Sequence, residues 1–196
     1  MPRTIQHSTR SRGYLPHWES PNATYFVTFR LADSLPQQLL TQLRKEQSSR
    51  PVATAANQTR TAKRVALLKR AEQALDVGLG QCHLRDPRIA KIVADALRHF
   101  AGRRYQLRAW CVMPNHVHVL FSPLEDHTLH AILQSWKSYS AKEINKLLDR
   151  TGPFWQHEYF DHLVRNKSYE QKFTEYIRNN PQKAGLTNWP WVEVLK

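Results

Sequence analysis

The sequence has few cysteines and no long apolar run. Its two cysteines, Cys82 and Cys111, have no metal-type spacing, which argues against both a cysteine metal site and a disulfide scaffold. No segment approaches the ~20 apolar residues of a membrane span, and no apolar stretch follows the N-terminus as it does in a signal peptide. From these absences we expect a cytoplasmic protein with no membrane attachment.

Acidic residues are scarce as well. The chain has 16 Asp and Glu residues against 29 Lys and Arg residues, which gives a formal net charge of +13. A charge of this size on a small protein favours a polyanionic partner, most often nucleic acid. Two other interpretations stay open: a protein that is merely basic and soluble, and one that binds a membrane surface, although no single amphipathic segment stands out.

The rest of the composition is that of one globular domain. Hydrophobic residues make up 41% of the 196 residues, and there is no repeat or low-complexity segment. We expect a basic N-terminal arm over residues 1–22, flexible unless it docks, and a single catalytic domain over 23–196. Residues 47–80 are interpreted as a basic insertion in that domain, either an arm that faces nucleic acid or a solvated helical segment.

Hydrophobic patterning indicates a mixture of helices and short strands. Strands are expected at 24–31, 104–113, 116–121 and within 153–166; helices at 35–47, 62–77, 86–102, 128–148 and 168–181; the tail after 182 is expected to be irregular. The elements do not alternate regularly as strand and helix, which favours an α+β fold with a central antiparallel sheet and helices packed on it.

Particular residues predict the helix ends. Asp86 and Pro87 are typical of an N-cap and the position after it, and Gly102 is typical of a helix stop. The last helix is expected to begin with a Ser168–Gln171 capping box, and Pro181 is expected to leave Asn180 at its frayed end.

The stretch "MPNHVHVLF" places two histidines on a buried strand. Because side chains at i and i+2 point to the same face, His116 and His118 project together, and Val117 and Val119 point the other way. Such a pair can bind one divalent cation. Two structural histidines with protein partners are the alternative. A HExxH zinc motif is excluded by the spacing, and a histidine-triad hydrolase would need a third histidine where Leu120 stands.

One face of the last helix is aromatic at its start and becomes polar toward the C-terminal end. Tyr169, Phe173, Tyr176 and Asn180 share that face by their spacing. Tyr176 is a candidate nucleophile, and Asn180, one turn later, is a candidate metal ligand through its carbonyl oxygen. In the alternative interpretation Tyr176 is a packed aromatic residue, and Asn180 caps the frayed end of the helix.

Four segments in order carry a family resemblance: 25–36, 113–123, 154–166 and 175–186. Together they resemble the REP-associated tyrosine transposases, a group of the IS200-like Y1 transposases in the HUH endonuclease superfamily. This resemblance implies the HUH, ferredoxin-like fold of the Y1 transposases. Residues from about 50 to 80 match no motif of that family.

The resemblance also implies a site and a reaction. It assigns His116, His118 and Asn180 to a divalent metal, Mg²⁺ or Mn²⁺, and Tyr176 to the role of nucleophile. The substrate would be single-stranded DNA with a REP-type hairpin, cut and rejoined through a 5′-phosphotyrosine. The protein would act near the nucleoid as a monomer or a homodimer. The sequence does not indicate which residue acts as the general base.

Further residues are candidates for contact with nucleic acid. Four basic residues flank the proposed nucleophile, a "WQ" pair is typical of the group, and "GYLPHW" near the N-terminus is similar to the family. The candidates are Arg165, Lys167, Arg178, Lys183, Trp155, Gln156, His17 and Trp18. Two other functions stay open: a relative that binds DNA hairpins without essential catalysis, and a basic RNA-binding module.

Overall fold

A computed structural model describes residues 8–11, 16–19, 23–48 and 57–195. In chain order its elements are β1 (Ser8–Ser11), β2 (Pro16–Glu19), β3 (Thr24–Arg30), α1 (Gln37–Ser48), α2 (Asn57–Asp76), the short 3-10 turn η1 (His83–Arg85), α3 (Pro87–His99), β4 (Tyr105–Val112), β5 (His116–Pro123), α4 (Leu129–Leu147), β6 (Phe160–Val164), α5 (Lys167–Lys183) and β7 (Val192–Val194).

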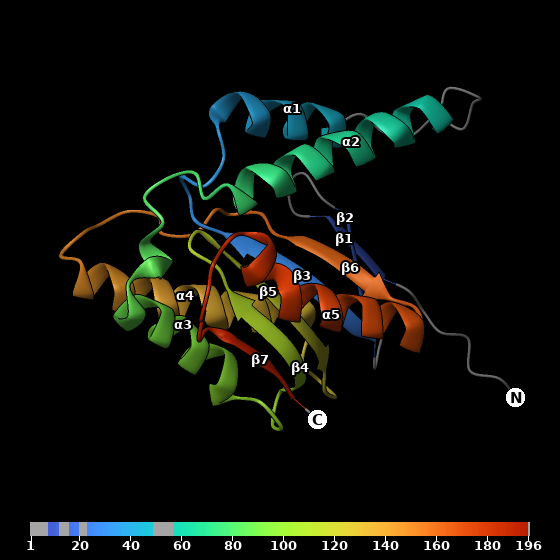
Figure 1. Ribbon diagram of the computed structural model, residues 1–196. Helices are drawn as coiled ribbons and strands as arrows, with labels where there is room; N and C mark the ends of the chain where they lie inside the picture. The colour runs from blue at the N-terminus through green and yellow to red at the C-terminus, as the bar shows by residue number, and fades with distance from the viewer. Residues whose placement is uncertain (1–7, 12–15, 20–22, 49–56, 196) are drawn as a thin grey trace, which may run out of the picture.

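Five of the strands form one sheet in the order β6-β3-β5-β4-β7, and every neighbouring pair is antiparallel. The predicted α+β fold with a central antiparallel sheet is confirmed. Helices α3 and α4 pack on one face of this sheet and α5 on the other, as Figure 1 shows. Strand β5, which carries the paired histidines, lies at the centre of the sheet.

Both faces of the central strands are covered, which explains why β4 and β5 are buried almost continuously. On one face Val117, Val119 and Phe121 pack with residues of α3 and α4. On the other face Leu120 packs in a smaller cluster with Ile177 of α5. The alternation expected for "HVHVLF" therefore separates the α3–α4 face from the α5 face, and the two histidines lie on the α5 face.

Helix α3 begins and ends as its sequence predicts. Asp86 is the N-cap, and its carboxylate accepts a hydrogen bond from the Arg88 backbone N–H at 2.9 Å. Pro87 is the first helical residue, and Gly102 follows the helix with φ +76°, a conformation that glycine adopts without strain.

Two predictions for the last helix are wrong. The N-cap is Asn166, not Ser168: its side chain accepts a hydrogen bond from the Tyr169 N–H at 3.0 Å, so α5 begins two residues earlier. The helix also does not fray at Asn180: it continues through Pro181 to Lys183, and the Ala184 N–H bonds to the Asn180 carbonyl to close one more turn. Asn180 therefore lies inside a regular helix rather than at a frayed end.

The tail is not wholly irregular, because Val192–Val194 forms the edge strand β7 against β4. A strand of three residues is too short to show a period in the sequence. Its place is held by tertiary contacts: Glu193 accepts hydrogen bonds from Arg98 at 2.8 Å and from the Trp110 indole N–H at 3.0 Å.

The N-terminal arm contains a two-stranded hairpin, with β1 paired to β2. Other parts of the predicted arm, residues 1–7, 12–15 and 20–22, lie outside the described residues, as do 49–56 of the predicted insertion. No helix in the described ranges combines the length and apolarity needed to cross a bilayer.

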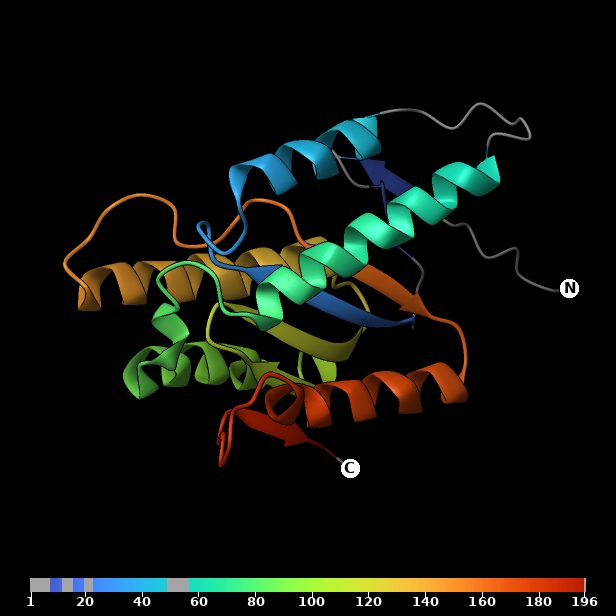
Figure 2. The same cartoon turned by 45° about the horizontal axis from the view of Figure 1, so that its top comes forward.

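Helices α1 and α2 run alongside each other and form a separate layer next to the sheet (Figures 1 and 2). Leucines hold them together. The cluster consists of Leu35, Leu39, Leu40, Leu43, Leu67, Ala71 and Leu75, with Ala74 and Phe160 packed against it. Phe160 belongs to β6, so the layer has an apolar connection to the edge of the sheet.

The loop after α2 is held tightly against the domain. Asp33 accepts a hydrogen bond from the Gln81 N–H at 2.8 Å, and the Asn115 side chain donates to the Leu79 carbonyl at 2.9 Å. Gly80 has φ +87°, and a Cβ atom there would lie 2.7 Å from the Asp33 carbonyl oxygen. Only glycine meets both requirements.

Replacing Gly80 tests this packing. Gly102→Ala places a side chain at φ +76° with open space around it, and we expect a loss of about 1–2 kcal/mol in unfolding free energy from the backbone alone. Gly80→Ala adds an overlap with Asp33, so its loss should be roughly 1–3 kcal/mol larger. Urea unfolding of both variants measures the difference, and equal losses would contradict the close approach of the loop to Asp33.

Candidate active site

The two histidines of β5 converge on one point. Their Nε2 atoms lie 2.9 Å apart, and their rings meet edge to face with centroids 4.6 Å apart. Both side chains are buried, with exposed fractions of 1% for His116 and 3% for His118. The sequence prediction that they share a face is confirmed.

The Nδ1 atom of each histidine contacts a polar side chain, which fixes the orientation of the ring. Asn115 Oδ1 lies 2.7 Å from His116 Nδ1, and Thr28 Oγ1 lies 2.7 Å from His118 Nδ1. The second contact follows from the strand register, since β3 pairs antiparallel with β5 and places Thr28 opposite His118. Second partners of this kind orient imidazoles that serve as ligands.

Asn115 determines which nitrogen of His116 carries the proton. The Asn115 amide N–H donates to Leu79, which directs its carbonyl oxygen at His116 Nδ1. That oxygen only accepts hydrogen bonds, so Nδ1 carries the proton and Nε2 presents its lone pair. The Thr28 hydroxyl can donate or accept, and it therefore suits either tautomer of His118.

Burial keeps both imidazoles neutral. Desolvation lowers the pKa of His116 to about 3, and desolvation together with the neighbouring His116 lowers the pKa of His118 well below its usual value. At neutral pH both rings are therefore uncharged, the form in which imidazole binds a metal.

Helix α5 brings Tyr176 to the pair. The Tyr176 ring lies 5.2 Å from the His118 ring, centroid to centroid, and 5.6 Å from the ring of Phe26. Phe26 also stacks on His118, at 5.4 Å. Of the candidates named from the sequence, His116, His118 and Tyr176 are thus brought together.

Asn180 follows one turn after Tyr176 and is 1% exposed. Its amide interacts with the Tyr176 hydroxyl and lowers the pKa of that phenol. Among the described residues, however, neither polar atom of its side chain has a hydrogen-bond partner of ordinary geometry. A buried amide without partners costs free energy, so this side chain is suited to bind a ligand.

The Tyr176 hydroxyl donates a hydrogen bond to Glu72 of α2. Burial, this hydrogen bond and the charges of Glu72 and Asp76 raise the pKa of Tyr176 above its ordinary value, against the smaller opposite effect of Asn180. The phenol is therefore protonated at neutral pH. Lys183 lies over the same ring, with its Nζ 5.3 Å from the centroid.

These residues fit a divalent cation. Two ligands at ~2.1 Å from a metal and at right angles to each other are about 3 Å apart, close to the separation of the two Nε2 atoms. Asn180 would add an amide oxygen, a donor that magnesium and manganese accept. The described residues contain no group of three or more His, Cys, Asp or Glu side chains that could hold a metal, so a site here depends on the amide.

The four predicted basic residues are all exposed on or next to α5. Lys167 begins the helix, Arg165 precedes it, Arg178 lies two residues after Tyr176, and Lys183 ends it. Of the four, Lys183 contacts the Tyr176 ring. Contact of these residues with nucleic acid remains a prediction.

Trp155 lies in the core rather than at the histidine pair. It is 6% exposed, and its indole N–H donates to Ser140 Oγ at 2.9 Å. The Gln156 N–H bonds to the Arg30 carbonyl at 2.9 Å, which ties the "WQ" segment to the end of β3. The indole is thus bound into the structure, and stacking on a nucleic-acid base is not its evident role.

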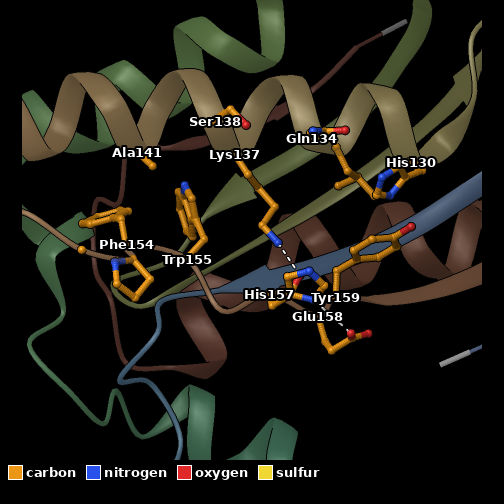
Figure 3. Close-up of a pocket in the computed structure, with 13 residues that line it drawn as sticks. His130, Gln134, Lys137, Ser138, Ala141, Phe154, Trp155, His157, Glu158 and Tyr159 are labelled. Atoms are coloured by element: carbon orange, nitrogen blue, oxygen red, sulfur yellow. Dashed lines mark hydrogen bonds and ion pairs between the residues drawn. The ribbon is translucent and has the colours of Figure 1, made fainter. Parts of the chain in front are cut away.

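Trp155 also lines a pocket of about 420 Å³ between α4 and residues 152–159 (Figure 3). Lys137 reaches across from α4 and donates to the carbonyl oxygens of Gln156 and His157 at 2.8 and 2.7 Å. Burial lowers the pKa of Lys137 to about 8. None of the proposed metal ligands lines this pocket, since α4 covers the other face of the sheet.

His17 and Trp18 belong to β2, apart from the strands of the main sheet. Their contact with nucleic acid remains a prediction.

Sequence reasoning missed three residues of the site: Glu72, Asn115 and Thr28. Asn115 directly precedes the histidines in "PNHVH", and that adjacency was its only signal. Thr28 depends on the pairing of β3 with β5. Glu72 is the first acidic residue after the basic stretch from Gln47 to Ala71, but no motif surrounds it.

This chain is similar to known proteins in sequence. The family model described as "Transposase IS200 like" matches residues 83–180, half of the chain. A REP-associated tyrosine transposase of Escherichia coli K12 is 27% identical over 45% of this chain and 54% of its own length. A protein of Haemophilus influenzae assigned to the same group is 25% identical over 44% of this chain and 57% of its own. The chain thus spans little more than half the length of these relatives.

The fold has a counterpart among solved structures. A REP-associated tyrosine transposase, determined bound to a REP hairpin, matches with a TM-score of 0.52 and 18% identity, over 94% of this chain and 81% of that one. At that identity the match shows a shared fold. The family match contains both histidines, the tyrosine and the asparagine of the site, and it spans half of the sequence; the chain belongs to the IS200-like transposase family.

Proposed function

We propose that this protein is a metal-dependent transposase that cleaves and rejoins single-stranded DNA at hairpin elements of the REP type. The observation that carries the proposal is the placement of Tyr176 against the converging imidazoles of His116 and His118. Asn180 lies one turn away, and the described residues offer its buried amide no hydrogen-bond partner of ordinary geometry. The similarity to REP-associated tyrosine transposases supports the choice of substrate.

The chemistry begins with a phosphodiester, whose negative charge repels a nucleophile. A divalent cation, Mg²⁺ or Mn²⁺, held by His116, His118 and Asn180 would draw charge from a non-bridging oxygen. The Tyr176 oxygen attacks phosphorus, the bond to the 3′ oxygen breaks, and a 5′-phosphotyrosine forms. Because the covalent link keeps the phosphodiester energy, attack by a 3′-hydroxyl on the same bond rejoins a strand.

The protein environment prepares these groups before DNA arrives. Asn115 and Thr28 orient the imidazoles, which lowers the cost of organising them around a ligand. Phe26 packs against the rings of both His118 and Tyr176 and keeps them in place. The exposed basic residues Arg165, Lys167 and Arg178 lie where they can bind backbone phosphates.

Tyr176→Phe tests the nucleophile. With a labelled DNA hairpin that has single-stranded flanks, and with Mn²⁺ present, the wild type should form a protein–DNA adduct that survives denaturation. Tyr176→Phe should form none, because only its hydroxyl is lost, and the measurement is a denaturing gel. Tyr169→Phe, an exposed tyrosine on the same helix, is the matched control and should behave as wild type.

Three results would count against this assignment. Adduct formation by Tyr176→Phe would remove Tyr176 as the nucleophile. Loss of the adduct in Tyr169→Phe alone would move that role to Tyr169. Tight hairpin binding by the wild type without any adduct would favour a DNA-binding relative that lacks catalysis.

His116→Ala tests the metal site. The variant should lose the rise in melting temperature that Mn²⁺ gives the wild type, and it should lose the adduct, while hairpin affinity stays within a few-fold. EDTA should have the same effect on the wild-type protein. His99→Ala, an exposed imidazole on α3, serves as the control.

A different pattern would identify His116 as a structural residue. In that case His116→Ala would bind the hairpin far more weakly, and Mn²⁺ would not change the melting temperature of the wild type.

A further inference from the structure

Helix α2 places two carboxylates beside Tyr176. Glu72 accepts the hydrogen bond of the Tyr176 hydroxyl, and Asp76 follows one turn later on the same helix. Asp76 is half-buried, and among the described residues its Oδ1 has no hydrogen-bond partner. Both carboxylates come from the predicted insertion, which matches no motif of the family and precedes the matched residues 83–180.

Two independent attachments hold α2 in this position. Its apolar face, with Leu67, Ala71 and Leu75, packs against the leucines of α1. Its C-terminal end is held by the loop in which Gly80 lies against Asp33 and Leu79 accepts from Asn115. Glu72 points away from the apolar face and toward α5, so its contact with Tyr176 follows from the packing of the whole layer.

The attack on phosphorus requires an acceptor for the phenol proton. A tyrosine hydroxyl carries its proton at neutral pH, and here it donates a hydrogen bond to Glu72, so the proton must leave as the new bond forms. The Nε2 atoms of His116 and His118 face each other, and the ammonium of Lys183 has no lone pair. Glu72 is the carboxylate in contact with the hydroxyl, and it is exposed to solvent on its other side.

We infer that Glu72 is the general base for Tyr176, a conclusion that rests on the proposed function. During cleavage Glu72 takes the proton from the Tyr176 oxygen while that oxygen bonds to phosphorus. The bond from phosphorus to the 3′ oxygen breaks, and the departing oxygen takes a proton from water. During rejoining the oxygen of a 3′-hydroxyl bonds to phosphorus and its proton goes to water. The bond from phosphorus to the Tyr176 oxygen breaks, and Glu72 returns its proton to that oxygen.

The neighbouring charges are compatible with a phosphate beside this base. Burial, and then the charge of Glu72, raises the pKa of Asp76 to about 6, while Lys183 lowers it. A substantial share of Asp76 is therefore protonated just below neutral pH. The remaining negative charge faces Lys183, whose ammonium lies over the Tyr176 ring.

Glu72→Gln tests the inference, because it keeps the shape of the side chain and removes its basicity. Adduct formation at neutral pH should slow by roughly 10²–10⁴-fold, the usual contribution of a general base. Hairpin affinity should be unchanged. The rate of the variant should keep rising with pH as hydroxide replaces the base, and should approach the wild-type rate in alkaline buffer.

Two further variants sharpen the test. Glu175→Gln removes the same charge from an exposed position next to Tyr176 and should leave the rate unchanged. Glu72→Ala should be slow in plain buffer and should regain part of its rate when formate is added, since a small carboxylate can occupy the vacated space. Circular dichroism checks that each variant is folded.

The possible outcomes are distinguishable. Adduct formation by Glu72→Gln at the wild-type rate overturns the role of Glu72 and leaves the proposed function standing. A slow variant with the pH dependence of the wild type, no response to formate and weaker hairpin binding shows a structural role and also overturns it. If the wild type forms no adduct with Mg²⁺ or Mn²⁺, the proposed function fails and the general base fails with it.

Discussion

The burial of two neutral imidazoles on the central strand is the constraint around which this site is organised. A buried ring nitrogen needs a partner, and His116 and His118 present four such atoms on one face of β5. Asn115 and Thr28 occupy the two Nδ1 atoms, and the two Nε2 atoms are left facing each other. The strand therefore brings two neutral ring nitrogens together at the middle of the protein, where burial disfavours the charged form of either imidazole.

Helix α5 covers the face of the sheet that carries the two histidines and adds two more side chains to the site. Ile177 packs into the sheet and fixes the rotation of the helix, which directs Tyr176 and Asn180 toward the same face. The continuation of the helix through Pro181 matters here, because it keeps Asn180 in regular helical geometry one turn from the tyrosine. One amphipathic helix thus supplies both the hydroxyl and the amide, and its remaining surface carries exposed basic residues.

The layer of α1 and α2 adds a carboxylate to a site whose candidate nucleophile and metal ligands all lie in the matched family segment. Residues 83–180 hold the histidines, the tyrosine and the asparagine, whereas Glu72 comes from the preceding helix. Asn115 connects the two parts, since its side chain bonds both to Leu79 in the loop after α2 and to His116. The same residue therefore orients the proposed metal ligand His116 and helps to hold the helix that carries the proposed base.

Local patterns in the sequence were enough to predict the strand with its histidine pair and the caps of α3. They also predicted that Tyr176 and Asn180 share one helix face. Each of these features depends on neighbouring residues and on the period of a single element. The pattern also led to the wrong cap for α5 and missed β7, whose three residues show no period. Tertiary structure alone decided that Thr28 meets His118 and that Glu72 meets Tyr176. These contacts join residues 90 and 104 positions apart, and no local periodicity reports which distant elements pack together.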